Sequence, residues 1–259
     1  MNIIYLLFHG LSPYSGISKK ILHQVKGFEA CGHRVSLCTY SITDNGHRAR
    51  MINNKIIEDY GTGKPAAAKR RVYYQCIYRY AVTHQVELIY VRSFHNANPF
   101  TIRLFSKLRK AGIKITMEIP TYPYDSEYAG FPLVTRLGIQ VDKVFRKTLA
   151  KHVNAIVTFS DYHCIFGQRT IQISNGVDFD SIPLKKTVSK NTSVIHLLGV
   201  AEVHYWHGLR PPDRGFWVNI TKTRQTQPYF STSQEVYGNP KCMIHNTLPD
   251  FMNLSTNII

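Results

Sequence analysis

The stretch that decides the fold begins with Asn2–Phe8, NIIYLLF. This nearly continuous apolar run is typical of a strand buried on both faces of a sheet. The loop HGLSPYSG follows over residues 9–16, and apolar residues at helical spacing then predict a helix that ends near Gly32. Arg34–Tyr40, RVSLCTY, predicts the next strand. Strand, loop, helix and strand in this order open a doubly wound sheet.

The same alternation continues to residue 173. Further strands are predicted over residues 87–92, 113–117, 155–159 and 170–173. Because these strands alternate with helical segments, neighbouring strands should run in the same direction. The chain is therefore predicted to be α/β, with a Rossmann-like, doubly wound and mainly parallel sheet and an irregular C-terminal tail.

Helices are predicted between these strands. Residues 41–64 are expected to be a polar excursion, followed by one basic, aromatic helix from Pro65 to Gln85. Another helix runs from Pro99 to Gly112, and Ser160 or Asp161 is expected to cap a short helix after the strand at 155–159. A long amphipathic helix is expected to turn its apolar face inward: Val134, Leu137, Val141, Val144, Phe145 and Leu149.

The composition favours an anionic partner. The 259 residues contain 32 Lys and Arg against 16 Asp and Glu, a formal net charge of +16. Such a charge favours nucleic acid, a phosphate-bearing substrate or an acidic membrane surface, although a basic protein without a special partner has the same composition. The five cysteines are scattered without a C-x-x-C pair, which indicates neither a zinc site nor a disulfide framework and fits a reducing compartment. No metal site is therefore predicted.

The glycine loop before the first helix is a candidate ligand site. Gly16 lets the backbone approach a ligand, and a helix N-terminus offers amides that bind anions. Ser18, Lys19 and Lys20 add a hydroxyl group and positive charge. The loop matches neither G-x-G-x-x-G nor G-K-[ST], so a nicotinamide dehydrogenase is disfavoured and a simple tight turn fits the loop equally well.

Polar residues follow two of the predicted strands. Arg92 ends the strand at 87–92, and Glu118 follows the strand at 113–117. Glu118 also begins EIPTYPYDSEY, residues 118–128, where two prolines stiffen a loop that carries Tyr124, Asp125 and Glu127. Ligands of such sheets bind beyond the carboxyl ends of the strands, and this set suits a hydroxyl-rich ligand. In the alternative, Asp125 and Glu127 are solvated or cap the next helix; no catalytic residue is assigned.

Basic residues gather on two of the predicted helices. The first set is Lys69, Arg70 and Arg71, interleaved with tyrosines, and the second is Lys143, Arg146 and Lys147. Basic residues with interleaved tyrosines bind RNA or lie against anionic lipid. A helix that packs its tyrosines on the sheet and leaves its charges in water has the same pattern.

Four segments together resemble the family 4 glycosyltransferases of the GT-B fold, of the bacterial surface-polysaccharide type. They are NIIYLLFHGLSPYSGISKKI from residue 2, EIPTYPYDSEY from residue 118, ISNGVDFDSIPL from residue 173 and LLGVAEVHYWHG from residue 197, in family order. The resemblance implies an acceptor-side domain over residues 1–190 and the first strand of a second domain over residues 191–208. It also implies that the Gly16 loop faces the cleft between domains and that the basic helices contact a membrane.

Residues 209–259 depart from the family pattern. In the family, a second domain supplies basic residues and paired glutamates that hold the nucleotide-sugar, whereas this tail has no sustained periodicity and is expected to be disordered or out of frame. The DNA encoding Gly208 to Gly215 can read, one nucleotide later, as Gly-Tyr-Asp-Arg-Leu-Ile-Glu-Gly, which is the expected continuation. A frameshift near Gly208 is therefore our hypothesis, and sequencing of the gene tests it.

The expected function is transfer of a sugar from a nucleotide-sugar to a hydroxyl acceptor, often lipid-linked, in surface-polysaccharide biosynthesis. The resemblance implies no cofactor beyond the nucleotide-sugar co-substrate, no nucleic acid, and a cytoplasmic location at the inner face of the cell membrane. Without a donor half, this chain alone is expected to show little transfer. The alternative is a non-catalytic basic module that binds nucleic acid or anionic membrane, which salt-dependent binding to nucleic acid would distinguish.

Overall fold

The computed structural model describes residues 1–13, 15–93, 95–124, 133–176, 178 and 182. The chain divides after Phe179, and the first unit, Met1–Phe179, contains every helix and strand described. The expected strand within residues 191–208 and the expected tail at 209–259 lie outside the described residues.

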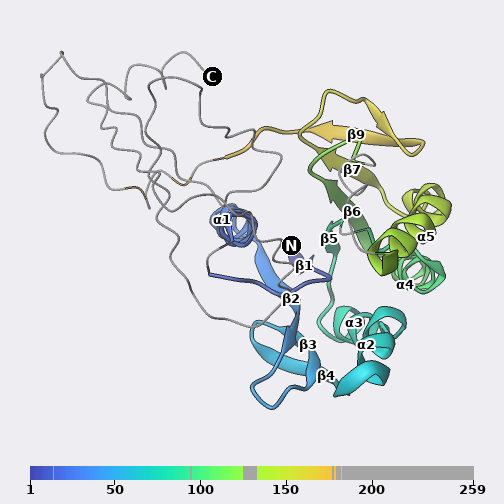
Figure 1. Cartoon of the computed structure of the whole chain (residues 1–259). Helices are drawn as coiled ribbons and strands as arrows, with labels where there is room; N and C mark the ends of the chain where they lie inside the picture. The colour runs from blue at the N-terminus through green and yellow to red at the C-terminus, as the bar shows by residue number, and fades with distance from the viewer. Residues whose placement is uncertain (14, 94, 125–132, 177, 179–181, 183–259) are drawn as a thin grey trace, which may run out of the picture. The chain divides into compact units, whose positions relative to one another are not determined.

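A nine-stranded sheet forms the centre of this unit, in the order β4-β3-β2-β1-β5-β6-β7-β9-β8 (Figure 1). The six strands from β2 to β9 in this order are parallel to one another. Each of them lies at a predicted position, so the mainly parallel α/β sheet is confirmed. The strands are β1 Asn2–Leu6, β2 Arg34–Ile42, β3 Arg48–Ile52, β4 Lys55–Gly61, β5 Leu88–Arg92, β6 Lys114–Ile119, β7 Ala155–Thr158, β8 Cys164–Ile165 and β9 Gln168–Gln172.

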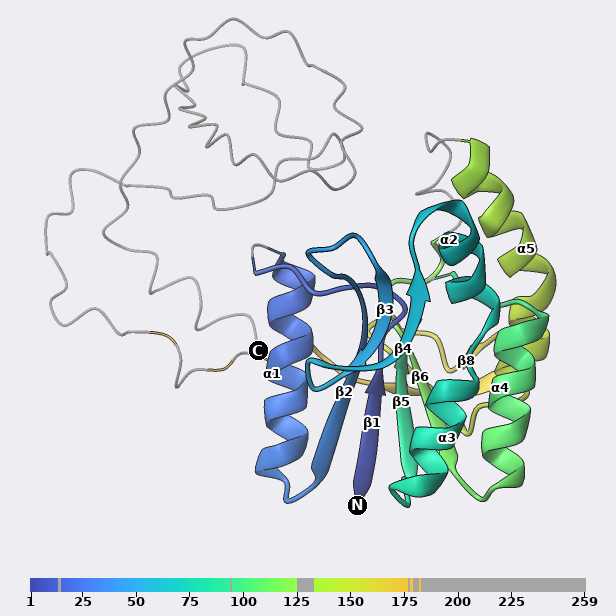
Figure 2. The same ribbon diagram turned by 90° about the horizontal axis from the view of Figure 1, so that it is seen from below.

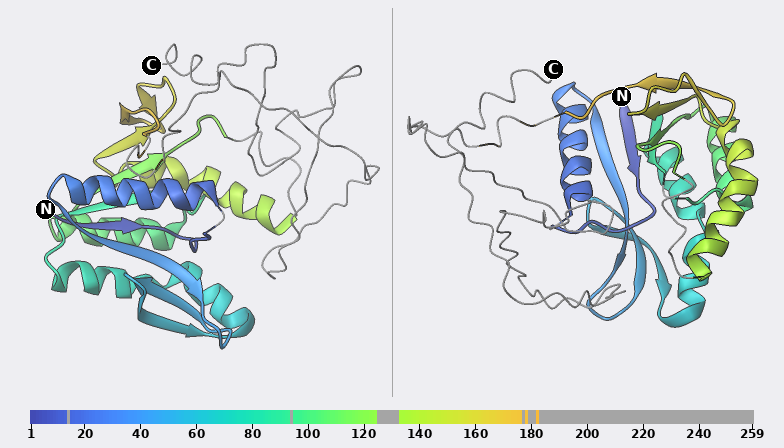
Figure 3. Two further views of the ribbon diagram at one scale, coloured as in Figure 1. Left: turned by 90° about the vertical axis from the view of Figure 1, so that its left-hand side faces the viewer. Right: turned by 45° about the horizontal axis from the view of Figure 1, so that its top comes forward.

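Antiparallel hairpins form both edges of the sheet, and neither was predicted (Figure 3). The predicted excursion at 41–64 is wrong, because β3 and β4 extend the sheet there. Asn53 and Asn54 join them with φ angles of 47° and 65°, the left-handed pair that a tight hairpin turn requires. The short helix expected after Ser160 is also wrong: β8 and β9 occupy its place and turn at Phe166 and Gly167, both of positive φ.

Helices cover the sheet unequally. Of the helices that the structure describes, α1, Gly16–Ala30, alone lies on one face, and the other face carries α2 to α5 (Figures 1 and 2). The single helix predicted over 65–85 is divided by Tyr73 and Tyr74 into α2, Gly63–Val72, and α3, Gln75–Thr83. The remaining two are α4, Pro99–Lys110, and α5, Leu133–Ala150. No helix in the described residues is long and apolar enough to cross a membrane.

The core follows the two-residue alternation of the strands. Ile3, Tyr5 and Leu7 pack with Ile21 of α1 on one face of the sheet. Ile4 and Leu6 point to the opposite face, where a larger apolar cluster includes residues of α3, α4 and α5. Both faces of β1 are therefore buried, as its continuous apolar run predicted.

The orientation predicted for α5 is correct for Phe145 and Leu149, which pack on the core, and wrong for Leu137, Val141 and Val144. Leu137, Val141 and Val144 are 58%, 45% and 70% exposed, whereas Leu149 and the charged Asp142 are buried. Asp142 faces inward because its carboxylate accepts hydrogen bonds from the Ala97 amide at 2.9 Å and the Tyr124 hydroxyl at 3.3 Å. The helix has apolar residues on two sides, and this buried carboxylate decides which side packs. The side chain of Val134 lies outside the described residues.

Candidate functional site

Several connecting segments lie together at the carboxyl ends of the parallel strands. The loop before α1 follows β1, and short polar segments follow β7 and β9. Because these strands are parallel, all of these segments lie on the same side of the sheet, beyond the carboxyl ends of the strands, where ligands of doubly wound sheets bind.

The loop before α1 is held by its own serines. The Ser18 hydroxyl is buried and accepts a hydrogen bond from the Ser12 amide at 2.9 Å, and Ser15 caps α1 by accepting one from the Ser18 amide at 3.4 Å. Lys19 is exposed, and a Cβ atom on Gly16 would meet no heavy atom within 4 Å. Of the three residues predicted here, Gly16 and Lys19 are therefore accessible, whereas Ser18 holds the loop together.

Lys20, in the first turns of α1, contacts the segments that follow β7 and β9. Its Nζ donates a hydrogen bond of 2.7 Å to Asn175 Oδ1 and lies 3.5 Å from the centre of the Phe159 ring. Burial lowers the pKa of Lys20; Glu118 opposes this effect and Arg92 adds to it. One turn of α1 thus touches the segments that follow β7 and β9.

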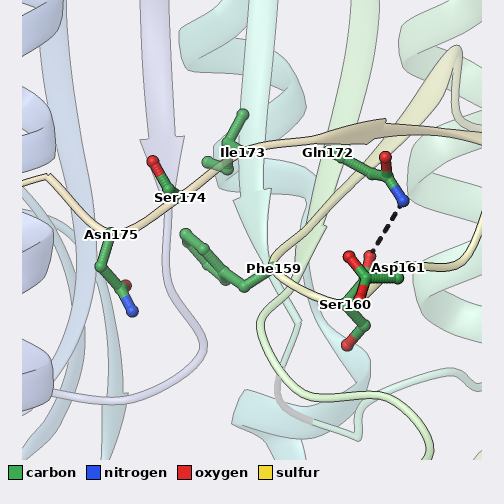
Figure 4. A pocket seen from close by; sticks show the side chains of 7 residues that line it. All are labelled: Phe159, Ser160, Asp161, Gln172, Ile173, Ser174 and Asn175. Atoms are coloured by element: carbon green, nitrogen blue, oxygen red, sulfur yellow. Dashed lines mark hydrogen bonds between the residues drawn. The ribbon is translucent and has the colours of Figure 1, made fainter. Parts of the chain in front are cut away.

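A pocket of about 440 Å³ lies next to Lys20 (Figure 4). The Gln172 side-chain amide donates to the Ser160 carbonyl at 3.4 Å, and the Ser160 hydroxyl accepts from the Tyr122 amide at 3.2 Å. One aromatic ring and several hydroxyl, amide and carboxylate groups therefore face a space large enough for a small polar ligand. The lining residues are Phe159, Ser160, Asp161, Gln172, Ile173, Ser174 and Asn175.

Arg92 and Glu118, both predicted to bind a ligand, lie inside the protein. They are 6% and 0% exposed and form an ion pair on the α1 face of the sheet. The Glu118 carboxylate also accepts hydrogen bonds from Tyr90 at 2.8 Å and Gln24 at 2.9 Å. Burial, and next the negative charge of Glu118, raise the pKa of Tyr90. Glu118 therefore links α1 to the sheet through Gln24, one turn after Lys20.

Tyr124 is the third predicted ligand residue away from the pocket. It is 5% exposed, donates its hydroxyl proton to Asp142 and lies with its ring 4.5 Å from the His95 ring. Asp125 and Glu127, predicted beside it, lie outside the described residues. The structure thus leaves Gly16 and Lys19 exposed in the first turn of α1, just before Lys20, and places Arg92, Glu118 and Tyr124 in the interior.

The basic residues predicted to face a membrane have varied surroundings. Lys69 pairs with Glu58 at 3.6 Å, Arg70 is half-buried above the Tyr40 ring, and the Arg146 guanidinium lies 4.6 Å from the Phe166 ring. Arg71 and Lys147 are exposed, and Lys143 is half-buried. Several of these cations therefore lie against protein groups.

The pocket residues after β7 and β9 were not predicted as a site. The available signal was their position: Phe159 and Ile173 end two predicted strands of a parallel sheet. Asn175 and Phe159 are the pocket residues for which a contact with Lys20 of α1 is described, and no sequence spacing relates either of them to Lys20. Among the residues that the structure describes, no group of three His, Cys, Asp or Glu side chains could hold a metal ion. No protein-family model, curated protein or solved structure matches this chain.

Proposed function

We propose that this chain binds a saccharide acceptor at the pocket beside Lys20, as the acceptor-side domain of a family 4 glycosyltransferase of the GT-B fold. One observation carries the proposal. Lys20 belongs to the segment NIIYLLFHGLSPYSGISKKI and Asn175 to ISNGVDFDSIPL, two of the segments that resemble the family, and the two side chains are hydrogen-bonded. Segments 155 residues apart thus meet at one pocket.

The chemistry of the pocket suits a sugar. The Phe159 ring offers an apolar surface to the C–H face of a pyranose, and Gln172, Ser174 and Asn175 offer donors and acceptors to its hydroxyl groups. Asp161 adds a carboxylate that can accept a hydroxyl proton in a hydrogen bond. A nucleotide-sugar would be the co-substrate, held by a separate donor half, in surface-polysaccharide biosynthesis at the inner face of the cell membrane.

Ligand binding to the full chain tests the proposal. Saturation-transfer NMR and calorimetry with oligosaccharides should detect binding that Lys20→Ala and Asn175→Ala weaken about tenfold. Asn175→Ala removes a polar group of the pocket, and Lys20→Ala removes the hydrogen bond that holds Asn175. Lys110→Ala is the matched control, since that exposed lysine ends α4 near the amino ends of the parallel strands, away from the pocket at their carboxyl ends. Absence of saccharide binding, or equal binding by all variants, would overturn the proposal. Tight nucleotide-sugar binding would overturn the expectation that the donor half is elsewhere.

Contact with an anionic membrane is a second candidate, favoured by the outer side of α5. Leu133, Leu137, Val141 and Val144 recur there at helical spacing and are exposed, and Lys147 follows one turn after Val144. An apolar stripe beside cations is typical of helices that lie in a membrane interface. Flotation with vesicles of anionic and neutral lipid tests it: binding to anionic vesicles that Leu137→Gln weakens supports it, and no binding excludes it.

A further inference from the structure

Three arginines lie around Tyr40, on the side of the sheet that ends in β4, and a fourth, Arg71, lies beside one of them. Arg48 and Arg50 are on β3, and Arg70 and Arg71 are on α2. Four strands, β2, β1, β5 and β6, separate β3 from β7. The cluster is therefore distinct from the pocket lined by Phe159 and Asn175.

Tyr40 connects three of the four side chains. Arg48 donates a hydrogen bond of 2.7 Å to the Tyr40 hydroxyl, and the Arg70 guanidinium lies 4.3 Å from the centre of the Tyr40 ring. Arg50 is the ladder partner of Tyr40 on the neighbouring strand. The Arg50 guanidinium also donates to the Leu7 carbonyl at 2.7 Å, which places it beside the end of β1.

The positive charge of this cluster has no counterion in the part of the chain that the structure describes. None of the four arginines forms an ion pair with a carboxylate there. Glu58, which faces Arg50 in the β3–β4 ladder, instead pairs with Lys69 and Arg79. Burial lowers the pKa of Arg70; Tyr40 opposes this effect, and Arg71, Arg48 and Arg50 add to it.

Two buried donors in the cluster lack an acceptor of ordinary geometry in the described part of the chain. Arg50 is 1% exposed, and its Nε–H has no hydrogen-bond partner of ordinary geometry among the described residues, although the Tyr60 hydroxyl lies near this guanidinium. The buried Nε–H of the half-buried Arg70 has no partner among these residues either. A buried donor without an acceptor and a buried cation without an anion are both unfavourable. A bound anion would supply the charge and the acceptors at the same place.

We propose that Arg48, Arg50, Arg70 and Arg71 form a binding site for a phosphoryl group. Guanidinium groups present planar pairs of donors that match phosphate oxygens. Arg50 forms the buried floor of the site, and the more accessible Arg48, Arg70 and Arg71 contact the ligand. The phosphoryl group comes either from a small soluble phosphate or from a lipid headgroup, which share this chemistry.

Calorimetry of the full chain with inorganic pyrophosphate tests the proposal, alongside flotation with vesicles of phosphatidic acid or, as the neutral reference, phosphatidylcholine. Arg48→Gln and Arg70→Gln should each weaken binding about tenfold, because each loses a charge-assisted hydrogen bond. Arg34→Gln is the matched control. Arg34 is exposed and begins β2, whereas Tyr40 lies near the carboxyl end of the same strand. Circular dichroism verifies that the variants are folded, and Arg70→Lys, which keeps the charge and loses the planar fork, should fall between the wild type and Arg70→Gln.

Each outcome decides the proposal. Pyrophosphate binding that these variants weaken supports a soluble phosphate, and binding to phosphatidic acid alone with the same losses supports a lipid headgroup. If neither ligand binds at millimolar concentration, or if Arg34→Gln loses as much affinity as Arg48→Gln, the site does not exist. Binding of single-stranded RNA that pyrophosphate does not displace would also overturn it, in favour of a nucleic-acid surface. Because the readout does not involve sugars, the result is independent of the saccharide proposal.

Discussion

Arg92 and Glu118 are ladder partners on the parallel strands β5 and β6, and their side chains form an ion pair in the interior. The same carboxylate accepts a hydrogen bond from Gln24, one turn after Lys20 on α1. The pair therefore links the centre of the sheet to the helix that reaches the pocket. The ion pair therefore has a structural role, although both residues lie at the carboxyl ends of their strands, where ligands of such sheets bind.

Loss of Glu118 should destabilise the protein strongly. Glu118→Ala leaves the Arg92 charge buried without a counterion, and we expect the free energy of unfolding to fall by about 3–5 kcal/mol, measured by urea denaturation. The double variant Arg92→Met/Glu118→Met removes both charges and should recover most of this loss. A loss below about 1 kcal/mol in the single variant would mean that the pair is not buried in solution.

Gly10, rather than Gly16, should be the glycine that the fold requires. A Cβ atom on Gly10 would lie 2.9 Å from the Tyr40 carbonyl oxygen, a backbone atom that cannot move without shifting β2. Gly10→Ala should therefore lower the free energy of unfolding by about 1–3 kcal/mol. Gly16→Ala meets no atom and should be neutral or stabilising by up to about 1 kcal/mol. Thermal and urea denaturation of both variants compare them directly, and equal losses would contradict the geometry.

The sequence predicted the parallel strands well because each is an apolar run buried on two faces. β1 is the clearest case, with Ile3, Ile4, Tyr5 and Leu6 all buried. The edge hairpins escaped prediction because their strands mix charged and apolar residues, as Arg48–Ile52 does. Asn53-Asn54 was the available turn signal, and it is typical of a two-residue hairpin.

The candidate site was harder to predict than the fold. Arg92 and Glu118 lie at the ends of strands, as predicted, but they are buried and therefore do not face a ligand. Their burial depends on α1, which packs over them and contacts Glu118 through Gln24. Asn175 and Lys20 are 155 residues apart in sequence, and they come into contact because of the order of the strands in the sheet, which the sequence does not specify. Arg50 fell in the segment predicted to be a polar excursion, so its burial could not be foreseen.

Acid should destabilise the protein partly through His9. Burial lowers the pKa of His9 below its usual value near 6.5; the hydrogen bond to the Gly10 carbonyl opposes this effect, and Arg92 adds to it. The unfolded chain therefore takes up this proton at a higher pH than the folded protein. The free energy of unfolding should fall as the pH drops through about 6.5 and stop falling, for this group, below the folded pKa.

Urea denaturation of wild type and His9→Gln between pH 5 and 8 isolates this contribution. The variant should show a shallower dependence of the unfolding free energy on pH below about 7. His23→Gln serves as the control, since His23 is exposed on α1. Parallel curves for wild type and His9→Gln would contradict the predicted role.

The orientation of α5 can be tested by substitutions on its two sides. Val144 is 70% exposed, so Val144→Ser should change the free energy of unfolding by no more than about 0.5 kcal/mol. Leu149 is 2% exposed in the main core, and Leu149→Ala should cost about 2–5 kcal/mol. Asp142→Ala should also destabilise, because the Ala97 amide and the Tyr124 hydroxyl lose their acceptor. If urea denaturation instead found Val144→Ser costly and Asp142→Ala neutral, the helix would be rotated toward the orientation that its apolar spacing first predicted.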